Sequence, residues 1–173
     1  VNISLGTEGG GGLTRIGAGN LLMVHVHVAH DCVIGDHCIF ANGVSLGGHI
    51  EIDSHAVFGG HVAVHQFVRI GARAMLAGGA IVVQDVPPFT MVHGNHARPN
   101  GLNVVGLRRA GISSEEFSAI KNCYRLLYNA NLPLTQAIAE IRATLGAFPS
   151  IETMLAFLDG CVADTKKQRG ICR

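Results

Sequence analysis

The hydrophobic residues in the first half of the chain follow a period of six. An aliphatic or aromatic residue recurs at every sixth position from Ile16 to Val82, and the position four residues later is also small or apolar, with Asn20 as the one exception. A helix repeats its apolar positions about every 3.6 residues and a half-buried strand every second residue, so neither sustains this period. A solenoid of short strands does, because stacked coils bury the same inward positions. The periodic residues are Ile16, Leu22, Val28, Ile34, Phe40, Leu46, Ile52, Phe58, Val64, Ile70, Leu76 and Val82.

This pattern resembles the hexapeptide repeat of left-handed parallel β-helix proteins, in which three hexapeptides form one triangular coil. The left hand comes from the resemblance alone, because left-handed crossovers are otherwise rare. The position after each periodic residue is mostly Gly or Ala, as at Gly35 and Gly47, and Gly suits a tight corner because it also adopts positive φ. The resemblance implies four coils over residues 16–87, with further coils expected upstream of Val1, where the chain begins without Met.

The rest of the chain has a different pattern. Residues 88–112 are rich in Gly, Asn and Arg and are expected to form a loop. Ser113 to Glu116 form an S-x-x-E capping box, which predicts the start of a helix. Helical spacing of apolar residues continues through residues 134–145 and 151–162. We therefore predict an all-β solenoid over residues 1–87, a linker over 88–112 and a C-terminal helical bundle over 113–173.

Composition narrows the functional classes. Apolar residues make up 48% of the chain and charged residues 14%, so a disordered polyelectrolyte is excluded. A net charge of +1 does not indicate a nucleic-acid partner, and no apolar run reaches the about 18–20 residues of a membrane span. The five cysteines are odd in number and lack CxxC spacing, which favours free thiols in a reducing compartment, and hence the cytoplasm.

Histidine is the most informative residue type. Eight of the ten histidines fall within residues 25–65. If one coil has about 18 residues, His30, His49 and His65 share one face, on coils about 4.8 Å apart. An imidazole there could act as a general base, and the neighbouring Asp31 could orient it. Alternatively, His25, His27 and His30 could bind zinc, but His30 is out of phase with the other two and no Cys or Glu completes the set.

Local strings carry a closer resemblance, to the UDP-N-acetylglucosamine O-acyltransferases that begin lipid A synthesis. The similarity runs in order from about residue 5 to the C-terminus. It rests on HVAHDC at 27–32, GGH at 47–49, VHQF at 64–67, QDVPP at 84–88, GNHA at 94–97 and GLRR at 106–109.

The resemblance implies a specific enzyme. Members move a 3-hydroxyacyl chain from acyl carrier protein to the glucosamine 3-hydroxyl of UDP-N-acetylglucosamine, as homotrimers with active sites between subunits and without a cofactor or metal. Carried over by residue, His30 would be the general base, Asp31 would support it, Gly48 would donate its N–H to the oxyanion, and His49 would hold the reacting groups. The substrate-binding residues would be His27, Gly60, His65, Gln66, Gly78, Asn103 and Arg109.

Several of these positions also have simpler interpretations. Asp31 could be a solvated neighbour of His30, Gln66 and Asn103 could be hydrogen-bonding turn residues, and Arg109 could be a solvated charge. Gly78 occupies the position that limits acyl length in the family, and a Gly there leaves the groove open. We therefore expect an acyl chain longer than about ten carbons.

Three alternative functions share the predicted fold. One is the related acyltransferase that N-acylates a UDP-acylglucosamine later in the same pathway. Another is a zinc lyase similar to the γ-carbonic anhydrases, which are also trimeric β-helices. The third is a trimeric scaffold without catalysis, in which the histidines would be dispensable. The HVAHDC and GLRR strings and the helical tail fit the O-acyltransferases better.

Overall fold

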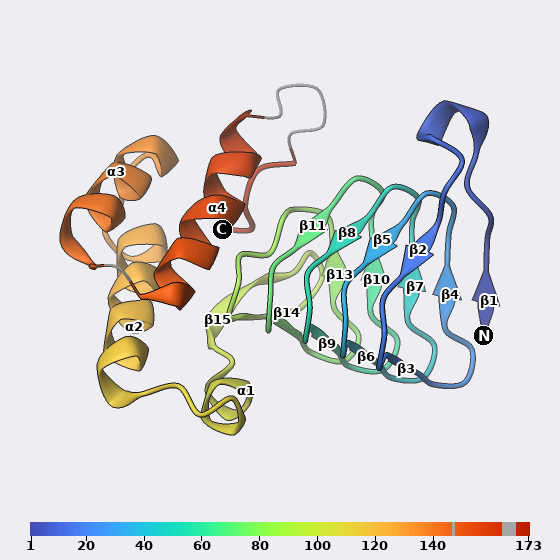
Figure 1. Ribbon diagram of the computed structural model, residues 1–173, viewed down its shortest axis with the longest axis horizontal. Helices are drawn as coiled ribbons and strands as arrows, with labels where there is room; N and C mark the ends of the chain where they lie inside the picture. The colour runs from blue at the N-terminus through green and yellow to red at the C-terminus, as the bar shows by residue number, and fades with distance from the viewer. Residues whose placement is uncertain (147, 164–168) are drawn as a thin grey trace.

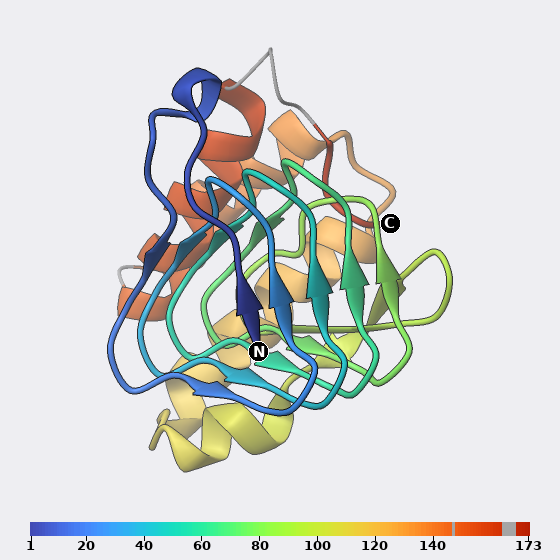
Figure 2. The same ribbon diagram turned by 90° about the vertical axis from the view of Figure 1, so that its right-hand side faces the viewer.

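The computed structural model describes residues 1–146, 148–163 and 169–173. A solenoid of short strands occupies one end of the molecule and a group of helices the other (Figure 1). Viewed along its axis, the solenoid is a three-sided coil (Figure 2). Residues 147 and 164–168, which belong to the predicted helical bundle, lie outside the described residues.

Each side of the solenoid is one sheet of short strands, which are two residues long and parallel except for two longer strands at the end of one sheet, the last of which is antiparallel. Face A, the first side, contains β1 (Asn2–Ile3), β4 (His27–Val28), β7 (Ser45–Leu46), β10 (Ala63–Val64) and β13 (Ile81–Val82). Face B contains β2 (Arg15–Ile16), β5 (Val33–Ile34), β8 (Glu51–Ile52) and β11 (Arg69–Ile70). Face C contains β3 (Leu21–Leu22), β6 (Ile39–Phe40), β9 (Val57–Phe58), β12 (Met75–Leu76), β14 (Thr90–His93) and β15 (Arg98–Leu102).

The periodic residues form the solenoid core, as the sequence predicted. Val28 pairs with Leu46, and Leu46 pairs with Val64 on the next coil, so like positions stack at intervals of one coil. Phe40 and Phe58 are fully buried, with ring centroids 4.6 Å apart and planes at 18°. Because every coil repeats these contacts, apolar burial is continuous along the axis.

The corners explain half of the histidines. From position 19 to position 79, every sixth residue has a positive φ. Apart from Gly, the residue types that best tolerate this region are Asn, Asp and His. Five of the ten histidines stand at such corners, and the corner residues are Gly19, His25, Asp31, His37, Gly43, His49, His55, His61, Phe67, Arg73 and Gly79.

The small residues after the periodic positions have a different role from the one expected. Gly35, Gly47 and Gly59 do not have positive φ, so that part of the prediction was wrong. Instead, a Cβ on Gly35 would lie 2.7 Å from the Ser54 nitrogen, and one on Gly47 would lie 2.7 Å from the Gln66 nitrogen. Glycine is needed there because the next coil passes too close for a side chain.

A loop interrupts the first coil. Ile3 pairs with Val28, whereas the next pair on the same face joins Val28 to Leu46. The first interval is therefore seven residues longer than the 18-residue coil. The extra length lies in the clamp loop, defined here as residues 7–14, which includes the short 3-10 helix η1 (Glu8–Gly10) and rises above the solenoid in Figure 1.

Residues 88–112 are not a simple loop, and this prediction was wrong. They contain β14 and β15, which form an antiparallel pair, followed by helix α1 (Val104–Arg109). Met91 and Val92 of β14 pair with β12, so this segment continues face C and covers a strand edge that would otherwise be unpaired. Four residues of alternating burial were too short a run to stand out in the sequence.

The helices are α2 (Ser114–Tyr128), α3 (Leu134–Thr144) and α4 (Pro149–Ala163). The Ser113 hydroxyl caps α2 by accepting from the Glu116 N–H at 3.2 Å, as predicted. The Glu116 carboxylate does not complete the box but accepts from the Ser150 N–H in the first turn of α4, at 3.1 Å. It therefore joins the starts of two helices. Among the described residues, no helix is both long and apolar enough to cross a membrane.

Arg69 joins the helices to the solenoid. Its guanidinium lies 5.0 Å from the ring centroid of Phe157 in α4, and its Nε lies 3.4 Å from a Glu51 carboxylate oxygen. The end of the chain also returns to the solenoid, where the Asp85 N–H donates to the Gly170 carbonyl and the Asp85 carbonyl accepts from the Cys172 N–H, both at 2.9 Å. The five cysteines are free and buried. The proposed domain limits at residues 87 and 112 remain predictions.

Candidate active site

His30 and Asp31 form a hydrogen-bonded pair at the corner between faces A and B. His30 Nδ1 lies 2.8 Å from Asp31 Oδ2, although residues next to each other on an extended chain point apart. The two side chains meet here because the backbone turns at the corner: Asp31 has φ +59°, which brings its side chain beside the His30 ring. The Asp31 side chain is 1% exposed and the His30 side chain 41%, so the imidazole faces outward while the carboxylate is enclosed.

The clamp loop surrounds the carboxylate. Asp31 Oδ1 accepts from the Thr7 N–H at 2.9 Å and Oδ2 from the Thr7 hydroxyl at 2.7 Å. The Thr7 hydroxyl is the main cause that lowers the pKa of Asp31 to about 2 against the opposing effect of burial, with His30, the Thr7 N–H and His49 adding to it. An ionised carboxylate only accepts hydrogen bonds, so His30 Nδ1 is the donor of this pair, which leaves Nε2 as the nitrogen that faces away from Asp31.

His49 lies directly beside this pair. Its ring centroid is 5.1 Å from that of His30 in an edge-on arrangement, and its Nε2 is 3.8 Å from Asp31 Oδ2. The prediction that His30 and His49 are close neighbours is therefore confirmed. On the next coil, Phe67 stacks on the His49 ring with centroids 4.7 Å apart.

Gly48 lies directly against the His30 ring, next to its Nε2. A Cβ at Gly48 would lie 2.6 Å from His30 Cε1 and 2.8 Å from Nε2, so only glycine leaves the ring in place. Within the described residues, the Gly48 N–H donates to no protein acceptor, while its carbonyl accepts from the Phe67 N–H. A backbone donor thus lies next to a base, which is the arrangement that acyl transfer requires.

Other predicted residues extend along face A. His27 lies on β4, and the exposed His65 and Gln66 follow β10, with His65 Nδ1 3.1 Å from the Gln66 carbonyl. Gly60 and Gly78 lie at the opposite corner, between faces C and A. A Cβ at Gly78 would have the Gly60 oxygen at 3.4 Å as its nearest neighbour, which is ordinary contact. Face A therefore connects the imidazole cluster to an open glycine corner.

Asn103 and Arg109 lie elsewhere, at the two ends of α1. Asn103 is the N-cap, since its Oδ1 accepts from the Gly106 N–H at 3.0 Å and its Nδ2 donates to the Arg73 carbonyl at 2.9 Å. Arg109 is exposed in the last turn of the helix. The structure brings neither residue to the imidazole cluster of this chain. A hollow of about 460 Å³ between β15, α1 and α2 includes none of the predicted site residues.

Sequence reasoning missed three contributors to the site. Thr7 and Thr14 lie in the clamp loop, outside the hexapeptide pattern, so no periodicity marked them. Thr14 accepts from the Asp31 N–H at 2.8 Å. Phe67 had a usable signal, because it stands one 18-residue coil after His49.

The structure also revises the candidate metal ligands. Ligand atoms of His30, Asp31 and His49 lie within 4.8 Å of one another, and among the described residues this is the group that could hold a metal ion. The set of His25, His27 and His30 is not brought together. Because donors from Thr7 and His30 already contact both Asp31 oxygens, the geometry favours a hydrogen-bonded pair over a ligand set.

Comparisons with known proteins agree with both halves of the fold. Residues 13–48 match the bacterial transferase hexapeptide family and residues 85–172 match domain 2 of UDP-N-acetylglucosamine O-acyltransferase. LpxA from Acinetobacter baumannii superimposes with a TM-score of 0.93 at 37% identity, over 99% of this chain and 64% of that one. The UDP-N-acetylglucosamine acyltransferase of Francisella novicida gives 0.90 at 36% identity, over 99% and 60%.

Curated sequences give the same result. The acyl-[acyl-carrier-protein]–UDP-N-acetylglucosamine O-acyltransferase of Aliivibrio fischeri strain MJ11 is 41% identical over the whole chain, which spans 64% of that protein's length. The same enzyme of Aliarcobacter butzleri is 50% identical over 136 residues, covering 79% of this chain and 52% of that protein.

The fold is that of the hexapeptide-repeat proteins: a left-handed parallel β-helix followed by a helical bundle, as the sequence predicted. The match over the C-terminal half narrows this class. The chain belongs to the UDP-N-acetylglucosamine O-acyltransferase family.

Proposed function

We propose that this chain carries the acyl-transfer site of an enzyme that moves a 3-hydroxyacyl group from acyl carrier protein to the 3-hydroxyl of UDP-N-acetylglucosamine, the first step of lipid A biosynthesis. The observation that carries the proposal is the position of His30, whose Nδ1 is held by Asp31 at 2.8 Å while Nε2 lies over Gly48. Family membership supplies the substrate class, and it implies a cytoplasmic reaction without a cofactor.

The chemistry follows from three groups. His30 Nε2 takes the proton of the sugar hydroxyl as its oxygen attacks the thioester carbonyl. The Gly48 N–H donates to the oxyanion of the tetrahedral intermediate. When the intermediate collapses, the C–S bond breaks, and the imidazolium returns its proton to the departing thiolate of the carrier. Asp31 stays ionised and stabilises the imidazolium, and His49 holds the reacting groups.

Face A provides the binding surface in this proposal. His27, His65 and Gln66 contact the sugar nucleotide, and the open corner at Gly60 and Gly78 receives the acyl chain. Asn103 and Arg109 hold the uridine and phosphates. Because these two residues lie away from the cluster of their own chain, they serve the site of a neighbouring subunit. The Asn103 amide already has two partners within this chain, so Arg109 provides the stronger contact, since phosphates need a cation.

The exposed apolar residues on face C support a homotrimer. One outward position on each of five successive strands is apolar, and these positions stand in register, with Leu21 48% and Ile39 38% exposed. Faces A and B carry mixed polar and apolar residues at the corresponding positions. An apolar ladder on a protein surface marks an interaction site, and three copies related by rotation close such a contact into a ring. The ladder consists of Leu21, Ile39, Val57, Met75 and Met91.

The decisive experiment measures acyl transfer from 3-hydroxyacyl carrier protein to UDP-N-acetylglucosamine with the intact protein. His30→Ala is expected to lower kcat by about 10²- to 10⁴-fold, the range for loss of a general base. His37→Ala is the matched control, because His37 is an exposed corner histidine between faces B and C, away from the cluster and from face A. A folded but inactive wild type, or an active His30→Ala variant, would contradict the proposal.

The same samples test the alternatives. Transfer to the amine of a UDP-acylglucosamine instead of the sugar hydroxyl would indicate the N-acyltransferase. Zinc at one equivalent per chain, lost in the His49→Ala variant, together with hydration of carbon dioxide, would indicate the lyase. Acyl transfer that survives removal of bound metal by a chelator supports the imidazole mechanism.

A further inference from the structure

The imidazole of His30 acts as a base only if its proton stays on Nδ1. That depends on the orientation of the Asp31 carboxylate, which comes from the next residue of a sharply turned corner. Because Asp31 directly follows His30 in the chain, its carboxylate faces the His30 ring in only a narrow range of side-chain orientations. A third group must therefore hold the carboxylate in that range.

The clamp loop supplies that group. Thr7 reaches Asp31 from 24 positions earlier and contacts both carboxylate oxygens, one with its N–H at 2.9 Å and the other with its hydroxyl at 2.7 Å. Thr14 accepts the Asp31 N–H at 2.8 Å. The loop therefore holds both the backbone and the side chain of Asp31.

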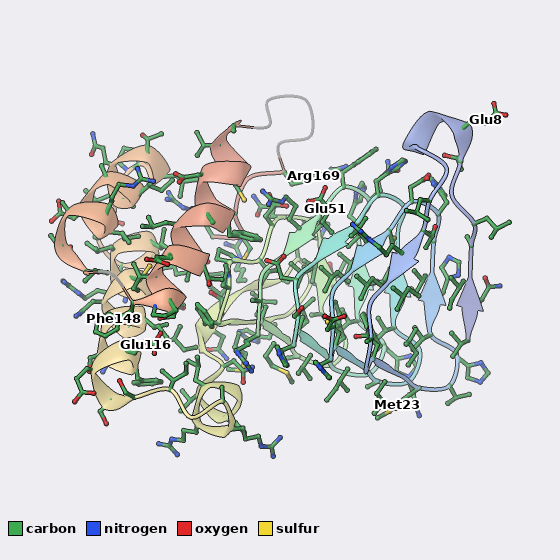
Figure 3. All side chains as sticks on the ribbon, viewed as in Figure 1. Glu8, Met23, Glu51, Glu116, Phe148 and Arg169 are labelled. Carbon is green, nitrogen blue, oxygen red and sulfur yellow. The ribbon has the colours of Figure 1, made fainter. Side chains whose placement is uncertain are left out.

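Gly10 completes the enclosure. A Cβ at Gly10 would collide with the Asp31 carboxyl group, whereas a Cβ at the adjacent Gly9 would have no neighbour within 4 Å. Figure 3 shows Glu8 at the tip of the loop, pointing away from the solenoid. The loop thus turns its glycine and threonine side toward Asp31 and its acidic side chain toward solvent.

The clamp loop is also an insertion that does not follow the hexapeptide repeat. Every other coil closes without it, and it adds seven residues at the one coil that faces Asp31. It contributes little to the core, because Thr7 and Gly9 are exposed and Gly10 is half-buried. Its contacts with Asp31 are therefore its clearest structural purpose.

We infer that Thr7 is a positioning residue, whose hydroxyl and N–H fix the Asp31 carboxylate so that His30 presents a free Nε2. The inference rests on the proposed function, because it concerns the same base. Loss of the Thr7 hydroxyl leaves Asp31 Oδ2 with one donor fewer and lets the carboxylate rotate away from Nδ1. Residues that orient the ligands of a metal site through hydrogen bonds typically change activity by about 10- to 100-fold when they are lost, and we expect the same range for Thr7.

The test compares Thr7→Val, which keeps the shape but lacks the hydroxyl, with Thr7→Ser, which restores it. Gly10→Ala and Gly9→Ala form a second matched pair. For each variant of the intact protein, kcat and KM are measured for acyl transfer. Nitrogen NMR of histidine-labelled protein reads which ring nitrogen of His30 bears the proton, with His30→Ala identifying its signals.

We expect Thr7→Val and Gly10→Ala to lower kcat by about 10- to 100-fold, with little change in KM for the sugar nucleotide. Both should mix the two His30 tautomers, while Thr7→Ser and Gly9→Ala behave as wild type. An unchanged tautomer and kcat in both disruptive variants would overturn the inference, as would a fall in kcat that Thr7→Ser does not restore. If wild type transfers no acyl group, the proposed function fails, and the NMR comparison alone still decides the role of Thr7.

Discussion

Replacing Gly48 by Ala adds one methyl group directly beneath the His30 ring. The added carbon would lie 2.6 Å from Cε1, whereas nonbonded carbons settle at about 3.5–4.0 Å. The imidazole must therefore move by about 1 Å. A displacement of that size costs about 100-fold in rate, or roughly 2.7 kcal/mol in activation free energy. The Ala variant keeps its backbone N–H, so the change isolates the position of the base from loss of the oxyanion donor.

Steady-state acyl transfer is the assay, with kcat and KM measured separately. We expect kcat to fall about 100-fold while KM for the sugar nucleotide stays close to wild type. Gly9→Ala is the matched control, because the same methyl group there meets nothing within 4 Å. A Gly48→Ala enzyme that is folded and retains at least half of wild-type kcat would refute the argument that His30 rests against this glycine.

Three further predictions concern stability and specificity. The pKa of Asp31 is lowered from 3.8 to about 2, chiefly by Thr7, so the contribution of this carboxylate to stability is present above about pH 4 and lost as pH falls toward 2. The urea midpoint of wild type should therefore drop more steeply over this range than that of Asp31→Asn. Parallel curves for the two proteins would contradict the prediction. Gly78→Met should fill the open corner and reduce kcat/KM for long acyl donors while sparing short ones, in a comparison of carrier proteins with different chains; equal loss for all lengths would place the acyl chain elsewhere. Phe58→Ala should lower the free energy of unfolding by about 3–5 kcal/mol, because the ring is fully buried against Phe40; urea denaturation measures this, and a loss below about 1 kcal/mol would contradict such close packing.

The solenoid could be predicted from the sequence because every coil buries the same hexapeptide positions. A period of six over twelve hexapeptides leaves one way to bury the aliphatic positions, and the pairing of like residues from coil to coil follows. The neighbourhood of His30 and His49 could be predicted from the same arithmetic. The capping of α2 by Ser113 needed only local sequence.

What could not be predicted lies where the period is interrupted. The clamp loop has no pattern of its own, and its importance comes from contacts 24 positions away. The strands β14 and β15 are short, and their partner is the edge of face C rather than anything nearby in sequence. The contact between His30 and Asp31 depends on a backbone turn at Asp31. An extended strand, in which adjacent side chains point apart, does not predict this contact.

The left-handed corners have a consequence for how such a site can arise. A position that accepts Gly, Asn, Asp or His for conformational reasons accepts a titratable group without further strain. The solenoid therefore offers, on each of its three edges, a column of positions where acids and imidazoles are already tolerated at the spacing of one strand. Asp31, His49 and Phe67 occupy one such column on successive coils. On this scaffold, a carboxylate and an imidazole become neighbours through substitutions that the backbone favours for its own reasons.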